Sequence, residues 1–139
     1  ALGRLMRKDN TPDALVTQLG IDTYVSDPIT HLALTTRGYL QVVELLAQAA
    51  RYIPWVALGG GGYDLSAVAR CWALAYGVMV GQDWPDEVPE GQRERLGTAR
   101  LRDDGTALQI PDYTRDASRR FAEATVQDVR RRIFHYHGL

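Results

Sequence analysis

What the sequence has little of excludes several classes of protein. Cys71 is the only cysteine among the 139 residues, which excludes an internal disulfide and a cysteine-rich zinc site and favours the reducing cytoplasm. Arg70 interrupts the longest apolar run, so no stretch reaches the roughly 20 residues of a membrane span. The net charge of -1 gives no electrostatic reason to expect nucleic acid or an anionic membrane as a partner.

The chain also lacks an initiating methionine, since it begins with Ala1, and no signal peptide is visible there. This start is consistent with an excised or processed piece of a longer chain. The composition, with 45% apolar and 24% charged residues, is that of an ordinary globular domain, and the length is sufficient for one hydrophobic core.

Two short apolar runs that end in glycine predict strands. DALVTQLG (13–20) and WVALGGGG (55–62) have the length and the ending of buried strands. A 3.6-residue apolar period predicts a helix over 36–52, which Pro54 ends. Strand, helix, strand and helix in that order are typical of a parallel α/β sheet with helices packed on it. Because two strands are too few for such a sheet, we expect either further strands in a missing N-terminal part or association through exposed apolar faces.

A second helix is predicted over 65–80, with Asp64 as its N-cap and Gly81 at its C-terminal end. Arg70 is its only charged residue, so we expect this helix to be buried on most faces. Residues 82–113 are rich in proline, glycine and charged residues, which is typical of a surface connection with one short helical turn.

The last predicted helix covers residues 116–134, and Arg130–Arg132 form a solvated face near its C-terminus. Its apolar stripe consists of Ala122, Val126, Val129 and Ile133, with Phe121 beside it. Cys71 is interpreted as a small core residue. The three histidines are interpreted as one surface residue and two tail residues, namely His31, His135 and His137.

Four consecutive glycines connect the second predicted strand to the following helix. Backbone N–H groups at such a turn can approach a ligand closely, yet GGGGYD matches neither the P-loop nor the dinucleotide-binding spacing. Asp64 would also place a negative charge where a phosphate should bind. The turn therefore leaves two interpretations open, either close packing against the sheet or close approach of a ligand.

Two polar residues lie at the same end of the predicted sheet. Tyr63 follows the second strand, and its phenol either donates a hydrogen bond to an oxyanion or covers the helix start. Asp27 follows the first strand and either binds a metal or stabilises the turn that Pro28 begins. Asp22 is a weaker alternative. One carboxylate alone cannot hold zinc, because catalytic zinc sites supply about three protein ligands.

Two segments carry a resemblance to a known family. QLGIDTYVSDPITHLALTTRGY and VALGGGGYDLSAVARCW together resemble the C-terminal part of the histone deacetylase superfamily, most closely its bacterial acetoin utilization proteins. The resemblance covers residues 13–90, after an N-terminal segment of residues 1–12. Residues 91–139 resemble the less distinctive loop and C-terminal helix of the same domain. This implies the C-terminal portion of a parallel-sheet, arginase/deacetylase-like three-layer α/β fold that is incomplete on its own.

The resemblance also implies a site. In this family two aspartates and one histidine hold a zinc ion, and the second aspartate corresponds to Asp27. Tyr63 corresponds to the tyrosine that polarises the substrate carbonyl and stabilises the tetrahedral oxyanion. The implied substrate-binding residues are Leu34 in the acyl-lysine channel and, at the pocket floor, Gly60, Gly61 and Gly62. The implied reaction is hydrolysis of an acetyl-amide, in an acetylated protein or in a small molecule such as an acetylpolyamine.

The chain departs from the family pattern in one respect. The family's Asp-x-His zinc motif occurs nowhere in it, and residues 1–12 contain no histidine. It therefore carries one of three zinc ligands and lacks the histidine pair that acts as general base. We expect Zn²⁺ in the intact protein, but neither tight zinc binding nor hydrolysis by this chain alone. The alternative to an enzyme fragment is a non-catalytic module that folds by self-association.

Overall fold

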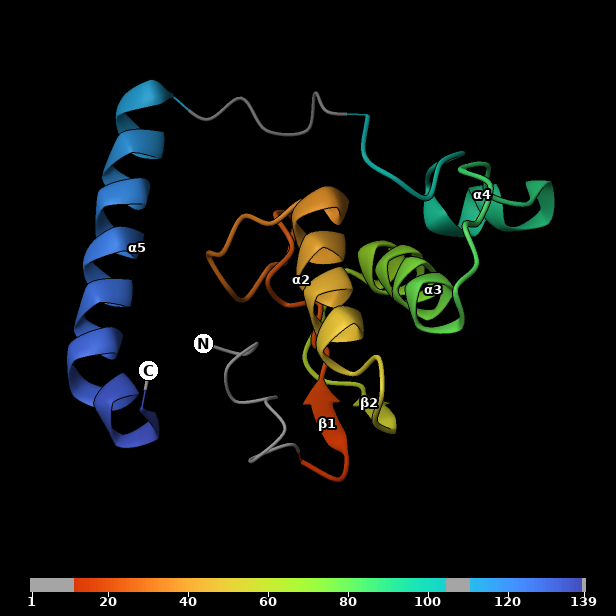
Figure 1. Ribbon diagram of the computed structural model, residues 1–139. Helices are drawn as coiled ribbons and strands as arrows, with labels where there is room; N and C mark the ends of the chain where they lie inside the picture. The colour runs from red at the N-terminus through yellow and green to blue at the C-terminus, as the bar shows by residue number, and fades with distance from the viewer. Residues whose placement is uncertain (1–11, 105–110, 139) are drawn as a thin grey trace. The chain divides into compact units, whose positions relative to one another are not determined.

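The computed structural model describes residues 12–104 and 111–138, which belong to two compact units (Figure 1). One unit spans Asp13–Ala107, and the other contains the C-terminal helix. The elements in chain order are β1 (Leu15–Gln18), α2 (Thr36–Ala49), β2 (Trp55–Leu58), α3 (Leu65–Val80), α4 (Glu90–Leu96), α5 (Asp112–Ile133) and the 3₁₀ helix η1 (Phe134–His137).

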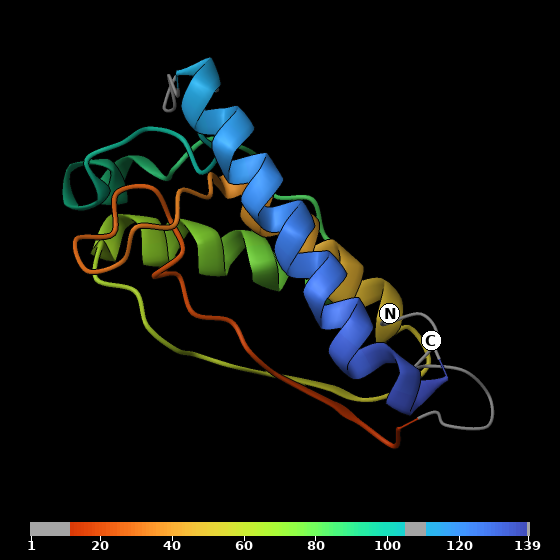
Figure 2. The same ribbon diagram turned by 90° about the vertical axis from the view of Figure 1, so that its left-hand side faces the viewer.

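The two strands form a parallel pair, as the order of the elements predicts. Leu15 lies opposite Trp55 and Gln18 lies opposite Leu58, with α2 as the crossover between the strands. Both helices α2 and α3 lie on one side of the pair (Figure 2), where Trp55 and Ala57 pack against the core. The side of the strand pair that faces away from these helices is not buried, so the prediction of buried strands is wrong for it. Burial alternates along both strands and leaves every second residue exposed.

Helix α2 begins where the sequence predicts and ends three residues early. The Thr35 hydroxyl caps the start by accepting a hydrogen bond from the Gly38 N–H at 3.3 Å. At the other end the Arg51 N–H bonds the Gln48 carbonyl, an i to i−3 bond that tightens the last turn before Pro54. The predicted last turn is therefore non-helical.

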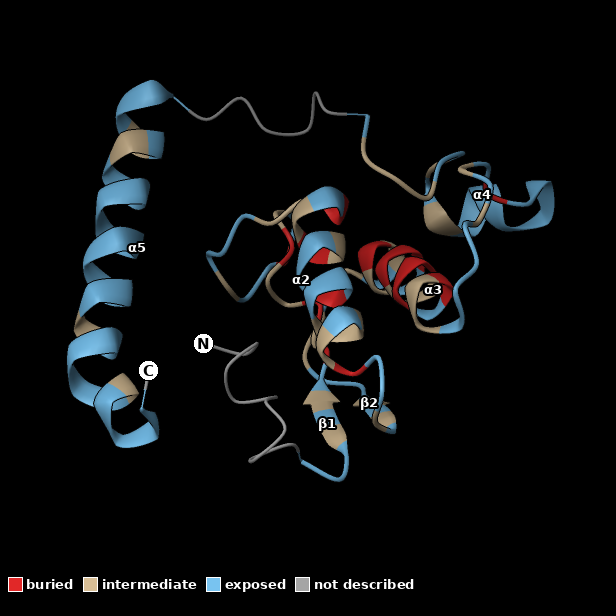
Figure 3. Ribbon diagram, in the orientation of Figure 1, coloured by how far each residue is buried: buried red, intermediate tan, exposed pale blue. Residues whose placement is uncertain are grey.

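Helix α3 has the predicted ends, because both signals are local. The Asp64 carboxylate accepts hydrogen bonds from the Ser66 and Ala67 N–H groups at 3.0 and 3.1 Å. Gly81 adopts the left-handed conformation with φ of 69°. The expected burial on most faces is confirmed, because the exposed residues form one narrow stripe and the rest of the helix is buried or half-buried (Figure 3). The exposed residues are Leu65, Ala69, Tyr76 and Val80. The buried residues are Ala67, Arg70, Cys71, Leu74, Ala75 and Gly77.

The core lies between α2, α3 and the first part of the loop that follows β1. Ile21 and Tyr24 from that loop, Val43 from α2 and Cys71 from α3 belong to one buried cluster. Cys71 is a fully buried, free thiol, which confirms it as a core residue, and burial raises the pKa of this thiol to about 12.

The predicted surface connection contains the short helix α4 and an antiparallel bridge between Glu87 and Arg100. The predicted last helix begins four residues earlier than expected, because Pro111 with φ of -54° occupies the position before its first turn. The described residues of α5 include no buried side chain, and its apolar stripe is exposed. No helix in the described ranges is long and apolar enough to cross a membrane.

Candidate functional site

The loop after β1 is closed at its neck by main-chain hydrogen bonds. The Val25 N–H bonds the Leu34 carbonyl at 2.9 Å, and the Leu34 N–H bonds the Thr23 carbonyl at 3.0 Å. Leu34 thus lies at the neck of the loop, and it is half-buried. The Asp27 N–H bonds the Tyr24 carbonyl at 3.0 Å, which begins the turn.

The Asp27 carboxylate is buried and receives three main-chain hydrogen bonds. Its Oδ1 accepts from the Ile29 N–H at 2.9 Å and the Thr30 N–H at 3.1 Å, as a turn-forming aspartate does. Its Oδ2 accepts from the Tyr63 N–H at 2.9 Å. Burial acts to raise the pKa of this carboxyl, but the hydrogen bonds from Ile29, Tyr63 and Thr30 outweigh it and leave the pKa below its ordinary value.

The hydrogen bond between residues 27 and 63 brings the two principal candidates together. It joins the loop after β1 to the turn after β2, at the carboxyl ends of the two parallel strands. Asp27 is 7% exposed, whereas Tyr63 is 54% exposed. The arrangement combines a fixed carboxylate with an accessible phenol.

The glycine turn packs closely against the segment that follows β1. A Cβ on Gly61 would lie 2.2 Å from Asp22 Oδ2, and a Cβ on Gly60 would lie 3.0 Å from the Gln18 side chain. Gly62 has φ of 142°, which L-residues rarely adopt, and its Cβ would lie 2.7 Å from Val68. Close packing therefore accounts for these glycines, and their place at a pocket floor stays a prediction.

A second contact joins the same two segments. The Ser26 hydroxyl donates a hydrogen bond to Asp64 Oδ2, so the α3 N-cap also holds the loop that carries Asp27. Burial acts to raise the pKa of Asp64, but the bonds from Ser26, Ala67 and Ser66 outweigh it and hold the pKa below its ordinary value.

The donor set for a metal is incomplete in the part of the chain that the structure describes. It contains no group of three or more His, Cys, Asp or Glu side chains that could hold an ion. His31 is exposed, and His135 and His137 lie in η1, which belongs to the other compact unit. Because catalytic zinc sites supply about three protein ligands, the role of Asp27 as a metal ligand stays a prediction.

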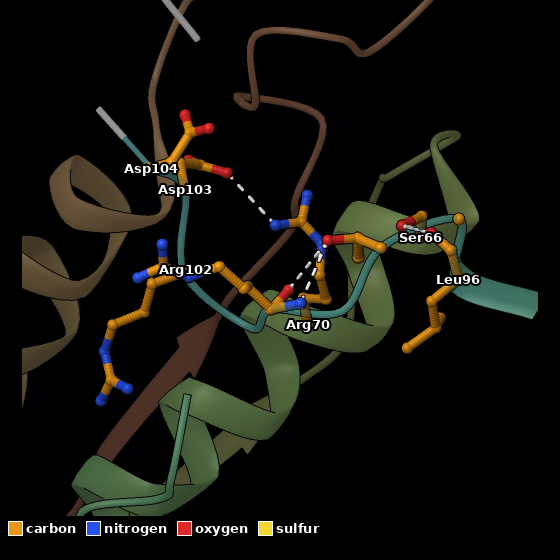
Figure 4. A pocket seen from close by; sticks show the side chains of 9 residues that line it. Ser66, Arg70, Leu96, Arg102, Asp103 and Asp104 are labelled. Atoms are coloured by element: carbon orange, nitrogen blue, oxygen red, sulfur yellow. Dashed lines mark hydrogen bonds and ion pairs between the residues drawn. The ribbon is translucent and has the colours of Figure 1, made fainter. Parts of the chain in front are cut away.

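The sequence did not identify three residues near the site as candidates, namely Tyr24, Arg70 and Asp103. Arg70 on α3 donates to the Tyr24 hydroxyl at 3.0 Å and to Asp103 Oδ1 at 3.2 Å. A cavity of about 270 Å³ beside them is lined by Arg70, Asp103 and neighbouring side chains (Figure 4). The only signal in the sequence is that Arg70 lies on the same helical face as Ala67 and Leu74. A charged side chain on a buried face is almost always paired with another polar group.

The family assignment comes from comparison with known proteins. The model of the histone deacetylase domain matches residues 3–79, which is more than half of the chain and includes Asp27 and Tyr63. The chain belongs to the histone deacetylase family. This confirms the resemblance carried by the two segments.

Curated relatives of this family match over a limited length. Type-1 histone deacetylase 1 of Dictyostelium discoideum is 40% identical over 78 residues, which are 56% of this chain and 15% of that protein. Acetoin utilization protein AcuC of Bacillus subtilis is 38% identical over 82 residues, or 56% of this chain and 21% of AcuC. The chain thus spans about a fifth or less of the length of these relatives.

A solved structure shows the fold. An HDAC homolog complexed with SAHA has a TM-score of 0.62 and 21% sequence identity to this chain. The likeness covers 83% of this chain and 36% of that one. The chain therefore supplies part of a deacetylase-like α/β fold, in agreement with the shortage of strands.

Proposed function

We propose that this chain is the part of a zinc-dependent deacetylase that carries one metal ligand, Asp27, and the oxyanion-binding Tyr63. The observation that supports this is the 2.9 Å hydrogen bond from the Tyr63 N–H to Asp27 Oδ2, in a chain of this family. The substrate of the intact protein would be an acetyl-amide, in acetyl-lysine or in a small molecule. Residues elsewhere in the intact protein would determine which of these two substrate classes binds.

Asp27 is suited to hold a metal through one oxygen. Each carboxylate oxygen accepts about two hydrogen bonds. Among the described residues Oδ1 accepts two and Oδ2 accepts one, so Oδ2 keeps capacity for a cation. The three N–H groups fix the direction of the carboxylate, as outer hydrogen bonds do for metal ligands. Zinc bound in the intact protein would polarise the amide carbonyl and lower the pKa of a water molecule.

Tyr63 is suited to bind the substrate oxygen. Its main-chain N–H is held by the Asp27 carboxylate, and the residue is 54% exposed. The phenol would donate a hydrogen bond to the amide oxygen as negative charge develops on it. Loss of a single donor of this kind lowers kcat about 100- to 1000-fold. Leu34 at the loop neck and the backbone of Gly60–Gly62 would line the acyl group beside it.

A chimera tests this proposal in a complete domain. The segment of Bacillus subtilis AcuC that corresponds to residues 13–104 is replaced by those residues, so that Arg70 keeps its partners Leu101 and Asp103. Hydrolysis of an acetyl-lysine peptide by this chimera is then measured. Tyr63→Phe should lower kcat about 100- to 1000-fold with little change in KM. Asp27→Asn should lower the zinc content of the purified chimera, because a neutral amide is a weaker ligand than a carboxylate.

The matched control is Tyr52→Phe, which removes a phenol from a residue that is 86% exposed on the turn after α2. This variant should keep the turnover of the unaltered chimera. Equal turnover of the Tyr63→Phe and Tyr52→Phe variants would contradict the proposed role of Tyr63, and unchanged zinc content in Asp27→Asn would contradict that of Asp27.

The second candidate function is a non-catalytic module that self-associates. It is supported by the uncovered side of the strand pair, where Val16, Val56 and Leu58 are exposed. Parallel sheets are normally covered on both faces, so this apolar surface favours a partner. Size-exclusion chromatography with light scattering distinguishes the candidates, since a stable monomer would contradict self-association.

A further inference from the structure

Asp103 joins three parts of the chain that are far apart in the sequence. Its Oδ1 accepts a hydrogen bond from the Tyr24 hydroxyl at 2.6 Å and from Arg70 at 3.2 Å. Its Oδ2 accepts from the Thr36 N–H at 2.7 Å, and its own N–H donates to the Thr36 hydroxyl at 3.0 Å. The Asp103 side chain is only 8% exposed, so these contacts are shielded from water.

Two of these partners lie at the two ends of the loop that carries the candidate site. Tyr24 precedes Asp27 by three residues, and its carbonyl holds the Asp27 N–H. Thr36 follows Leu34 by two residues and begins α2. The Asp103 carboxylate also lies at the positive N-terminal end of that helix, which favours its negative charge. Asp103 is therefore bonded to both ends of the segment 24–36.

Arg70 on α3 completes the connection, and Figure 4 shows its guanidinium paired with the Asp103 carboxylate. Its guanidinium donates to the Tyr24 hydroxyl at 3.0 Å and to the Leu101 carbonyl at 3.2 Å, and it lies 5.5 Å from the centre of the Tyr24 ring. The Arg70 side chain is 10% exposed, so its charge compensates a buried carboxylate. The network is closed, because Tyr24, Arg70 and Asp103 each bond the other two.

The protonation states agree with these contacts. Burial and the hydrogen bond to Asp103 raise the pKa of the Tyr24 phenol to about 12, so it remains a donor at neutral pH. Burial acts to raise the pKa of Asp103, but hydrogen bonds from Tyr24, Thr36 and Arg70 outweigh it and leave the pKa below its ordinary value.

Asp103 is presented by a segment that lies beyond the family match. That match ends at residue 79, whereas residues 86–102 form their own hydrogen-bonded arrangement. The Val88 N–H bonds the Ala99 carbonyl at 2.9 Å, and the Leu101 N–H bonds the Asp86 carbonyl at 2.7 Å. The Arg102 N–H bonds the Asp86 carboxylate at 2.8 Å, which holds the chain immediately before Asp103.

We propose that Asp103 is a positioning residue, which fixes the loop of residues 24–36 so that Asp27 meets the Tyr63 N–H. The segment 86–104 thereby becomes part of the site, although it lies outside the family match. The meaning of this role for catalysis rests on the proposed function of Asp27. The contacts themselves involve only residues of this chain, so they can be tested separately.

Amide hydrogen exchange of the metal-free 139-residue chain, followed by NMR, tests this inference. Asp103→Asn and Tyr24→Phe should each accelerate exchange at least about tenfold at the three N–H groups that bind Asp27, because the loop opens more often. These groups belong to Ile29, Thr30 and Tyr63. Exchange of the Leu19 N–H, which bonds the Leu58 carbonyl at the strand ends, should stay unchanged.

The control variant is Trp84→Phe, which removes the 2.8 Å hydrogen bond from the Trp84 indole to the Ala73 carbonyl. It perturbs α3 away from the network and should leave the three N–H groups protected. The double variant Tyr24→Phe/Asp103→Asn should exchange no faster than the faster single variant, because both changes break the same connection.

Unchanged protection in the single variants would overturn the inference. Equal acceleration of the Leu19 N–H would also overturn it, since Asp103 would then serve global stability only. Where Asp103→Asn does not fold, as judged by circular dichroism, Tyr24→Phe alone decides between these outcomes. Failure of this experiment leaves the chimera test of Tyr63 intact, and failure of the chimera leaves this one intact.

Discussion

Helices α3 and α5 both carry arginines, but they place them in opposite surroundings. On α3, Arg70 is buried and bonds Tyr24 and Asp103, which are 46 and 33 residues away in the sequence. On α5, Arg131 and Arg132 are exposed and pair with Asp128, three and four residues away. Figure 3 shows the difference, since α3 has a buried face and α5 is exposed almost throughout.

The comparison teaches where a charge can determine tertiary structure. A buried guanidinium is stable only when it is paired and hydrogen-bonded with good geometry, because an unpaired charge in the interior raises the free energy of the folded state. An exposed pair along a helix is solvated with or without its partner, so it contributes little. The arginine of α3 therefore connects segments that are distant in the sequence, whereas Arg131 and Arg132 of α5 pair with a residue of their own helix.

The largest expected effect is that of Arg70→Met, which keeps the volume of the side chain and removes its charge. Asp103 would remain buried without its ion pair, and the Tyr24 hydroxyl would lose a donor. Removing one partner of a buried pair costs about 3–5 kcal/mol of unfolding free energy. Urea denaturation followed by tryptophan fluorescence measures this loss.

The matched control for Arg70→Met is Arg131→Met, which removes an exposed arginine of α5. The free energy of unfolding should change by about 0.5 kcal/mol or less, as for other exposed ion pairs. Equal losses of unfolding free energy in the two variants would contradict the difference between a buried and an exposed arginine.

A smaller effect is expected from acid. The carboxyls of Asp64 and Asp103 have a pKa in the folded state below the ordinary value of about 3.9. The stability that they contribute is therefore present above about pH 4 and is lost as the pH falls through the pKa of the folded state. Urea midpoints measured between about pH 5 and pH 2 should decrease, and less steeply in Asp103→Asn. An equal decrease in that variant would show that Asp103 does not contribute.

The smallest effect is expected from Asp128→Asn, which removes the partner of Arg131 and Arg132 on α5. Each exposed pair within a helix contributes about 0.3–0.5 kcal/mol. The helical signal in circular dichroism should melt at a slightly lower temperature in low salt, and about 1 M NaCl should remove the difference. A large loss that persists in high salt would indicate that α5 uses this face for tertiary contacts.

The elements that local signals define could be predicted from the sequence. Asp64 and Gly81 mark the two ends of α3, and the apolar period locates α2 to within one turn. The start of α5 lies four residues before the predicted one, because the proline-rich composition of the connection conceals that Pro111 also suits a helix start. The exposed side of the strands could not be predicted, since apolar runs do not reveal whether a second layer is present.

The site was predictable only in part. The order of the strands and the family resemblance together brought Asp27 and Tyr63 to one end of the sheet, and their hydrogen bond agrees with that. The connection from Arg70 to Asp103 was missed, because a pair separated by 33 residues leaves no periodic trace in the sequence. Nothing local distinguishes Asp103 from its exposed neighbour Asp104.

The bond between residues 27 and 63 uses the peptide nitrogen of the tyrosine, not its ring. Any amino acid except proline offers the same donor, because only proline lacks the hydrogen. The side chain at position 63 can thus be replaced without removing the hydrogen bond to the Asp27 carboxylate. Selection on the side chain at position 63 is therefore independent of the main-chain contact that orients Asp27.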